Sequence, residues 1–192
     1  MKKNNYYTNI ELSKIGFKKI GRNVRISNSC RFYSFSGEIG NNTRIDDYSI
    51  FKGKIFFGSN VHISSFCYFA AVGGEIVIGD LSGISNKVSI YAVTDDFLGD
   101  FLTNPTVMDK FKNVKRGKVI IGKNVSIGSH CLILPNVLVG DSSSLGAMSL
   151  VNKNVKNGQV LLTKQEKFYG VKKNLKIINI KINKFKKLNS SI

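Results

Sequence analysis

Two adjacent carboxylates, Asp95 and Asp96, lie in the segment VSIYAVTDDFLGDFLTNPTV at residues 88–107. A carboxylate can take up a proton from a nucleophile or hold an ammonium group in place. Because the reference pKa of an aspartate is about 3.9, it deprotonates a hydroxyl poorly near neutral pH, unless burial or a shared site raises that pKa. An amine needs less base, so the pair favours an amine acceptor slightly over a hydroxyl. Loop solvation or an Asx turn is the alternative interpretation.

The other candidate bases are the two histidines, His62 and His130. Imidazole is the side chain whose ordinary pKa lies closest to neutral pH. Any imidazole base in this chain is one of these two, although a single surface histidine usually has no catalytic role. We rank His62 behind Asp95 as the base, and His130 third.

The charge balance favours anionic partners. The 192 residues include 29 Lys and Arg against 12 Asp and Glu, a formal net charge of +17, with much of the excess after Leu162. Such a chain suits phosphorylated ligands or an anionic membrane surface, which the basic tail could contact peripherally. Simple solvation of a lysine-rich protein is an equally weighted explanation. We expect no nucleic-acid partner, because no helix-turn-helix, RNA-binding aromatic motif or zinc finger is present.

The cysteines and the apolar pattern limit the cellular setting. Cys30, Cys67 and Cys131 are odd in number, and no CxxC or Cys/His ligand spacing occurs, so we expect neither a disulfide framework nor a metal site. No apolar run approaches 18 residues, and the N-terminus lacks the apolar segment of a secretory signal. The expected location is the cytoplasm.

These residues are embedded in a six-residue repeat. From Ile121 the chain divides into IGKNVS, IGSHCL, ILPNVL, VGDSSS, LGAMSL and VNKNVK. Each block opens with an aliphatic residue, and its fifth place is small or β-branched. The same register returns upstream from Ile20, so repeats cover most of residues 20–156.

A six-residue period with one obligatory aliphatic position predicts a parallel β-helix, since helical spacing would spread that position around an axis. Three blocks form one triangular coil, and coils stack about 4.8 Å apart. The first and fifth places should face the interior. All three cysteines occupy the fifth place, so we interpret them as small core residues and not as nucleophiles.

The repeat also predicts the organisation of the chain. Residues 1–19 form a helical cap, with a capping box from Thr8 to Glu11. Residues 20–162 form the β-helix, interrupted by a loop at residues 96–115. Residues 163–192 form an irregular basic tail, in which residues near Ile180 could be a strand or a basic amphipathic helix.

The segment VIIGKNVSIGSHCLILPNVLVGDSSSLGAMSLVNKNV, residues 119–155, closely resembles the hexapeptide-repeat acyltransferases. The upstream segments YYTNIELSKIGFKKIGRNVRIS, RIDDYSIFKGKI and NVHISSFCYF resemble the bacterial subgroup that acts on sugars of surface polysaccharides. That subgroup includes amino-sugar nucleotide acyltransferases of the dTDP-4-amino-4,6-dideoxyglucose kind. The resemblance implies a left-handed β-helix, a homotrimer with active sites between subunits, and acetyl-CoA as co-substrate.

The resemblance also implies site residues. Ser129 and Ala147 match positions whose backbone holds the pantetheine arm, and Asn152 matches a threonine that lines it. Where the family has Gly-x-Pro-Ala, this chain has Lys172 and Lys173, which could meet the phosphates of coenzyme A. In many sugar O-acetyltransferases of the family a loop histidine is the base, and Asp95 stands in that place. Our candidates for binding the acceptor are Ser65, Asn86 and Asn104.

We therefore expect an acetyl-CoA-dependent acetyltransferase acting on a sugar or a nucleotide-linked amino sugar for bacterial surface polysaccharide synthesis. A sugar O-acetyltransferase of the galactoside or maltose type is the main alternative. A non-catalytic β-helix scaffold is a further one, although its zinc-binding version needs three suitably placed histidines. A serine acetyltransferase usually carries a longer helical N-terminal domain than this chain has.

Overall fold

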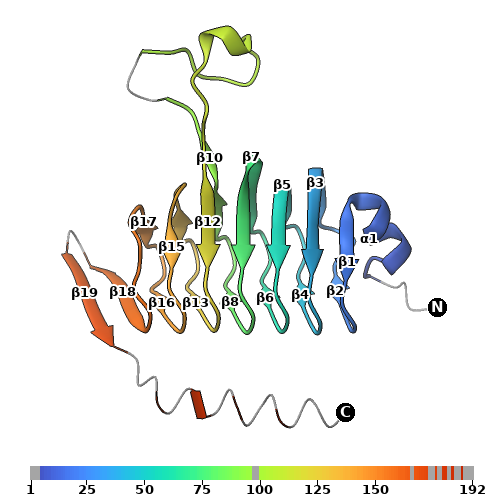
Figure 1. Cartoon of the computed structure of the whole chain (residues 1–192), viewed down its shortest axis with the longest axis vertical. Coiled ribbons are helices and arrows are strands. Elements are labelled where there is room, and N and C mark those ends of the chain that lie inside the picture. Colours follow the sequence, from blue (N-terminus) through green and yellow to red (C-terminus); the bar gives the residue numbers. More distant parts are fainter. Residues whose placement is uncertain are drawn as a thin grey trace.

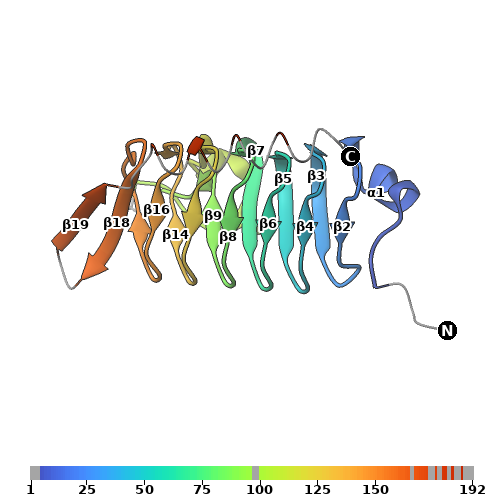
Figure 2. The ribbon, with the colours of Figure 1, turned by 90° about the horizontal axis from the view of Figure 1, so that it is seen from below.

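The protein is a left-handed β-helix in which triangular coils stack along one axis (Figures 1 and 2). The computed structural model describes residues 5–96, 100–164 and 167–172, together with Lys176, Asn179, Ile180, Asn183 and Lys187. The predicted fold class is confirmed. Within the described residues, no helix combines the length and the apolar character needed to cross a bilayer.

One side of the coil is formed by an eight-stranded sheet with the order β19-β18-β16-β13-β8-β6-β4-β2. Its strands run parallel except for the β18–β19 pair. The strand bounds are β2 (Arg25–Ile26), β4 (Arg44–Ile45), β6 (His62–Ile63), β8 (Gly83–Ile84), β13 (Ser126–Ile127), β16 (Ser144–Leu145), β18 (Gln159–Lys164) and β19 (Lys167–Lys172).

The other two sides belong to a nine-stranded sheet, because its longest strands continue through a bend where the pairing register shifts. Its strands are β1 (Phe17–Ile20), β3 (Arg31–Ile39), β5 (Ile50–Phe57), β7 (Tyr68–Ile78), β9 (Ser89–Tyr91), β12 (Lys118–Ile121), β14 (Leu132–Ile133), β15 (Leu138–Val139) and β17 (Leu150–Val151).

The inward-facing positions are the two that the repeat predicts. In the blocks from Ile121 onward, every first-place and every fifth-place residue is buried. The fifth places are Val125, Cys131, Val137, Ser143, Ser149 and Val155. Upstream, Cys30 and Cys67 are equally buried. Small side chains fit there because the chain turns sharply towards the next side of the triangle.

Two of the three corners border the eight-stranded sheet. The first corner comprises residues 46–49, 64–67, 85–88, 128–131 and 146–149, which follow β4, β6, β8, β13 and β16. The third corner comprises residues 21–24, 40–43, 58–61, 79–82, 122–125 and 140–143, which lead into the eight-stranded sheet. The fourth place of the block has a positive φ at both corners, for example 54° at Asn124 and 61° at His130.

A loop leaves the remaining corner. Its stem is a two-stranded antiparallel pair of β10 (Val93–Thr94) and β11 (Lys115–Arg116), and its outer part contains the 3-10 helix η1 (Asp109–Phe111). In Figure 1 the loop projects from the upper edge of the solenoid, whereas β6, β8, β13 and β16 lie at the lower edge.

Both ends of the solenoid are closed. Helix α1 (Asn9–Ile15) has the predicted capping box between Thr8 and Glu11, and it buries Leu12 against the first coil. The segment before α1 makes an antiparallel bridge from Tyr6 to Ser27. At the other end β19 pairs antiparallel with β18. The repeat did not predict this terminal hairpin, whose second strand lies in the region expected to be an irregular tail.

Candidate active site

A groove of about 620 Å³ runs along the outer surface of the eight-stranded sheet and its first corner. It crosses the coils from β6 to β18. Its lining comprises His62, Ser64, Gly83, Ile84, Ser85, Asn86, Ser126, Ile127, Gly128, Ser129, Ser144, Leu145, Gly146, Ala147, Val160 and Leu162.

The groove exists because the outward positions carry small residues. Gly83, Ser126 and Ser144 pair across β8, β13 and β16, and no bulky side chain rises from these strands. A Cβ atom added at Gly83 would meet no heavy atom within 4 Å, so this position opens directly into the groove. At Gly128 a Cβ would instead lie 2.5 Å from the backbone nitrogen of Ala147. One glycine thus leaves space, and the other permits close stacking of the coils.

The first-corner rim of the groove contains three of the predicted residues. Asn86, Ser129 and Ala147 occupy the same third place in successive coils, and all three line the groove. The Ser129 hydroxyl donates to Asn86 Oδ1 at 2.5 Å. Backbone nitrogens tie the coils together along this rim, His130 N donating to Asn86 O at 3.2 Å and Met148 N to Ser129 O at 2.8 Å. The rim is therefore a rigid column of short side chains with accessible backbone.

Ser65 occupies the third place one coil earlier, in line with Asn86. Its carbonyl oxygen accepts a hydrogen bond from Lys87 N at 3.1 Å. Its side chain is not among those that line the groove in the described part of the chain. The neighbouring Ser64 lines the groove in its place.

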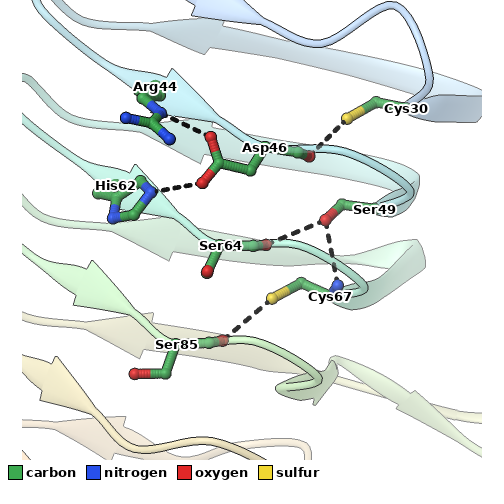
Figure 3. A network of polar contacts seen from close by, with 8 residues as sticks. All are labelled: Cys30, Arg44, Asp46, Ser49, His62, Ser64, Cys67 and Ser85. Atoms are coloured by element: carbon green, nitrogen blue, oxygen red, sulfur yellow. Dashed lines mark hydrogen bonds and ion pairs between the residues drawn. The ribbon is translucent and has the colours of Figure 1, made fainter.

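His62 stands at the N-terminal end of the groove and pairs with a carboxylate (Figure 3). Its Nε2 lies 2.8 Å from Asp46 Oδ2, and Arg44 Nε donates to Asp46 Oδ1 at 2.6 Å. Burial raises the pKa of Asp46, but the hydrogen bonds and charges of Arg44 and His62 outweigh it and hold the pKa below its ordinary value. Asp46 is therefore an anion that orients two basic groups.

The three buried thiols hydrogen-bond to the first corner from inside, two of them at residues that line the groove. Cys30 Sγ donates to Asp46 O at 3.1 Å, and Cys67 Sγ to Ser85 O at 3.3 Å (Figure 3). Cys131 Sγ donates likewise to Gly146 O at 3.0 Å. In each case the acceptor is a second-place residue of the next coil. The cysteines are structural, and burial raises the pKa of Cys30 to about 12 and that of Cys67 to about 11.

The two aspartates of the loop stem have different surroundings. Asp96 is 6% exposed and accepts a hydrogen bond from Asn113 Nδ2 at 3.1 Å, across the loop. Asp95 is partly exposed, and its carbonyl oxygen accepts from Thr94 Oγ1 at 3.3 Å. Among the described residues, neither aspartate lines the groove of its own chain.

Asn104 and Asn152 also lie away from the groove of the same chain. Asn104 Oδ1 accepts from the backbone nitrogen and the hydroxyl of Thr106, at 3.0 and 2.9 Å, which is an Asx turn in the loop. Asn152 lines a separate hollow of about 160 Å³ beside Leu161. Both residues belong to the side of the coil from which the loop projects.

Three further candidates are only partly described or lie apart. The backbone of Lys172 ends β19, but its side chain is outside the described residues, as is the whole of Lys173. His130 is an exposed first-corner residue and does not line the groove.

A second hollow, of about 700 Å³, lies at the base of the loop and is bordered by charged residues. Glu75 accepts from Lys54 at 2.6 Å and from Lys118 at 2.7 Å. Both lysines thus pair with the same carboxylate in the wall of the hollow. Within the described residues, no group of three or more His, Cys, Asp or Glu side chains is placed to hold a metal ion.

The sequence interpretation missed Arg44 and Asp46. Arg44 pairs in register with His62, and His62 with Gly83, so the three form one outward column. Counting the sixth place of each block finds this column, which continues from Gly83 to Ser126. The partner carboxylate of His62 lies 16 residues upstream at a second place, which requires knowledge of how side chains lean across neighbouring coils.

The chain was compared with known proteins. No family model matches the sequence. Over 152 residues it is 37% identical to dTDP-4-amino-4,6-dideoxy-D-glucose acyltransferase of Escherichia coli, a match that covers 78% of this chain and 79% of the relative.

Two solved structures are similar over almost their whole length. AntD, an N-acyltransferase from Bacillus cereus in complex with dTDP and 3-hydroxybutyryl-CoA, has a TM-score of 0.86 at 37% identity, covering 97% of this chain and 99% of that one. A variant of AntD in complex with dTDP-4-amino-4,6-dideoxyglucose and coenzyme A has a TM-score of 0.85 at 35% identity, covering 96% and 99%.

Proposed function

This chain belongs to the hexapeptide-repeat acyltransferases, the family of the dTDP-4-amino-4,6-dideoxyglucose acyltransferases, and we propose that it transfers an acetyl group from acetyl-CoA to the amino group of a nucleotide-linked amino sugar. The observation that carries the proposal is the groove of small residues beside the column Asn86, Ser129 and Ala147. A surface hollow this long suits an extended co-substrate with a small acceptor at its end.

The groove fits the pantetheine arm of coenzyme A. That arm is a narrow chain of two amides, and the first-corner rim offers backbone groups at Ser129 and Ala147 with little side chain in the way. Bound there, the co-substrate supplies an acyl group activated as a thioester. We assign its reacting end to the neighbourhood of Asn86, since Ser85, Asn86 and Gly83 form the middle of the groove.

Acetyl transfer needs attack by the amine on the thioester carbon, with formation of a C–N bond and cleavage of the C–S bond. The acceptor binds as an ammonium ion, so a carboxylate at the site would both orient it and receive its proton. We propose Asp95 for this role. The ammonium nitrogen loses two protons overall: one passes through Asp95 to water before the amine attacks, and the other protonates the released coenzyme A thiolate. Asp96, which is buried against Asn113, shapes the loop that presents Asp95.

We propose a homotrimer, because the single chain separates the parts of this site. Asp95 and Asn152 lie on the loop side of the coil, and the groove lies on the eight-stranded sheet. A second copy whose loop side faces the groove would bring them together. Exposed apolar side chains on the intervening side, such as Tyr33 and Leu150, suit a contact between copies.

A second candidate, O-acetyl transfer to a sugar hydroxyl, is favoured by one observation. A carboxylate-oriented imidazole is the arrangement that deprotonates a hydroxyl, and His62 with Asp46 has this form at the edge of the groove. In that reaction His62, and not Asp95, would be the base.

The test measures release of free thiol from acetyl-CoA with nucleotide-linked amino sugars and, in parallel, with the corresponding neutral sugars. We expect turnover with the amino sugars. Longer acyl-CoA donors establish the preferred acyl group. Turnover with neutral sugars alone would favour the O-acetyl alternative, and no turnover together with no binding of coenzyme A would refute both.

A further inference from the structure

We propose that Arg44, Asp46 and His62, together with the aromatic pair Tyr48 and Phe66, form the subsite for the nucleoside diphosphate half of the acceptor. The inference rests on the proposed function, since it assumes a nucleotide-linked sugar. It assigns the phosphates and the base to particular residues of this chain.

The phosphate half of the subsite is a pair of exposed basic side chains, those of Arg44 and His62, held by the less exposed carboxylate of Asp46. Arg44 and His62 face each other in register on β4 and β6. Their side chains are 48% and 49% exposed, whereas that of Asp46 is 18% exposed. Asp46 engages Nε of Arg44 and Nε2 of His62, and within the described residues the terminal nitrogens of Arg44 have no hydrogen-bond partner. A guanidinium with a free planar fork is the group best suited to phosphate oxygens.

The positive surface continues along the same column. Arg25 pairs in register with Arg44 on β2 and is exposed. Two arginines and a histidine therefore line the outer surface beyond the end of the groove. The guanidinium groups of Arg25 and Arg44 give this part of the surface the hydrogen-bond donors that phosphate oxygens accept.

The base half of the subsite is a stacked aromatic pair on the first corner. The rings of Tyr48 and Phe66 lie 5.2 Å apart with an angle of 22° between their planes, and the residues are 60% and 54% exposed. They lie two residues after Asp46 and Ser64 around the corner. An exposed flat aromatic surface beside bound phosphates is the usual platform for a nucleobase.

The backbone conformation at Tyr48 and Phe66 does not by itself favour aromatic side chains. Tyr48 and Phe66 have φ values of 60° and 63°, a left-handed conformation that bulky side chains adopt at a cost in free energy. Asparagine adopts it far more easily, and the equivalent place of the third corner carries Asn23, Asn42, Asn60 and Asn124. Asparagine thus holds four of the six third-corner places, beside Leu81 and Ser142, whereas the first-corner places carry Tyr48, Phe66, Lys87, His130 and Met148 and no asparagine.

The position relative to the groove matches the order of groups in the substrates. Coenzyme A occupies the part near Ser129 and Ala147, so the nucleotide must extend from the acceptor sugar in the opposite direction. From Ser85 to Arg44 is two strand spacings, about 10 Å, which leaves room for one sugar between thioester and phosphates. Arg44, His62 and the aromatic pair lie where the nucleoside diphosphate is then located.

The experiment measures dissociation constants of the full-length protein by calorimetry for dTDP, thymidine, inorganic pyrophosphate and coenzyme A. Arg44→Gln should raise the dissociation constants of dTDP and pyrophosphate about tenfold and leave that of thymidine unchanged. Phe66→Ala should weaken the binding of dTDP and of thymidine and leave the binding of pyrophosphate unchanged. Neither variant should alter coenzyme A binding. Arg22→Gln, an exposed arginine of the third corner, is the charge-matched control and should bind every probe as the wild type does.

Because each variant should affect a different pair of ligands, the result distinguishes loss of the subsite from loss of folding. Unfolding would weaken the binding of all four ligands. Unchanged dTDP binding in both variants would overturn the inference and leave the proposed function standing. The inference would also be overturned if Phe66→Ala changed the molar mass in solution and left dTDP binding unchanged. The aromatic pair would then be a contact between copies of the chain. Failure of the wild type to bind both dTDP and coenzyme A would refute the proposed function as well.

Discussion

Cys67 Sγ donates a hydrogen bond to the backbone carbonyl oxygen of Ser85, 3.3 Å away on the next coil. Ser85 lines the groove, so a core thiol supports a groove residue through its main chain. The same relation joins Cys30 to Asp46 and Cys131 to Gly146. The inner and outer surfaces of the coil are therefore mechanically linked at the first corner.

The thiols should be inert in the native protein. Burial raises the pKa of Cys30 to about 12 and that of Cys67 to about 11, and it raises the pKa of Cys131 as well. At pH 8 a chromogenic disulfide reagent should label none of the three until denaturant is added, and all three afterwards. Rapid labelling of the folded protein would contradict the buried arrangement.

The same pKa shifts predict a loss of stability at alkaline pH. The unfolded chain releases thiol protons near pH 8.5, whereas the folded chain holds them to about pH 11 or 12. The unfolded state then binds fewer protons, so the free energy of unfolding falls as pH rises through this interval, by at most about 1.4 kcal/mol per pH unit for each thiol. Urea titrations at pH 8, 9 and 10 measure this slope, and Cys67→Ala should reduce it.

Filling the groove at Gly83 should abolish transfer without unfolding the protein. A Cβ at this position meets nothing within 4 Å, so Gly83→Val adds its side chain to the groove alone. We expect kcat/KM to fall roughly 100-fold, since displaced reactants lose their alignment, while the melting temperature is unchanged or higher. Lys123→Val, an exposed change on the third corner, is the control and should retain activity. A fully active Gly83→Val would show that the groove is not the site of transfer.

Asp95→Asn should lower kcat about 100-fold or more, because the proton acceptor is lost while the shape is kept. KM for acetyl-CoA and the melting temperature should stay close to those of the wild type. Steady-state thiol release measures this, with Asp100→Asn, an exposed loop carboxylate, as the matched control. If Asp95→Asn retained full activity, the catalytic role of the loop would have to be abandoned in favour of His62.

Asp96 should behave differently from its neighbour. Asp96→Ala leaves the Asn113 amide without this acceptor at a buried position, so the free energy of unfolding should fall by about 1–3 kcal/mol. Asp96→Asn keeps an acceptor oxygen, so its free energy of unfolding should fall by less. Urea denaturation measures the difference, and limited proteolysis should cut the loop faster in the alanine variant. Equal stability of Asp96→Ala and wild type would exclude a structural role.

The fold was predictable because the six-residue period constrains every block in the same way. First and fifth places must face inwards wherever the coil turns, which also explained the cysteines as core residues. The site was harder to predict from the sequence, since a coil has three corners and the repeat alone does not distinguish them. Ser129 and Ala147 are 18 residues apart and share a corner, whereas Asn152 belongs to another side of the coil.

Contacts between coils account for the remaining differences between the sequence-based expectations and the structure. The pairing of His62 with Asp46 depends on side-chain directions across two coils, and the amphipathic pattern of neither strand reveals it. The hairpin of β18 and β19 begins where the repeat fades, so no periodic signal marked it. The opposite environments of Asp95 and Asp96 arise from the return strand of the loop, which brings Asn113 to only one of them.

The antiparallel closures at the two ends of the solenoid have a consequence for self-association. A stack of parallel coils presents, at each end, a row of backbone donors and acceptors on which another chain could continue the stack, as in fibril growth. The antiparallel bridge from Tyr6 to Ser27 and the antiparallel β19 each change the hydrogen-bond spacing at these ends. A second chain that continues the parallel stack therefore meets a different hydrogen-bond spacing at each end.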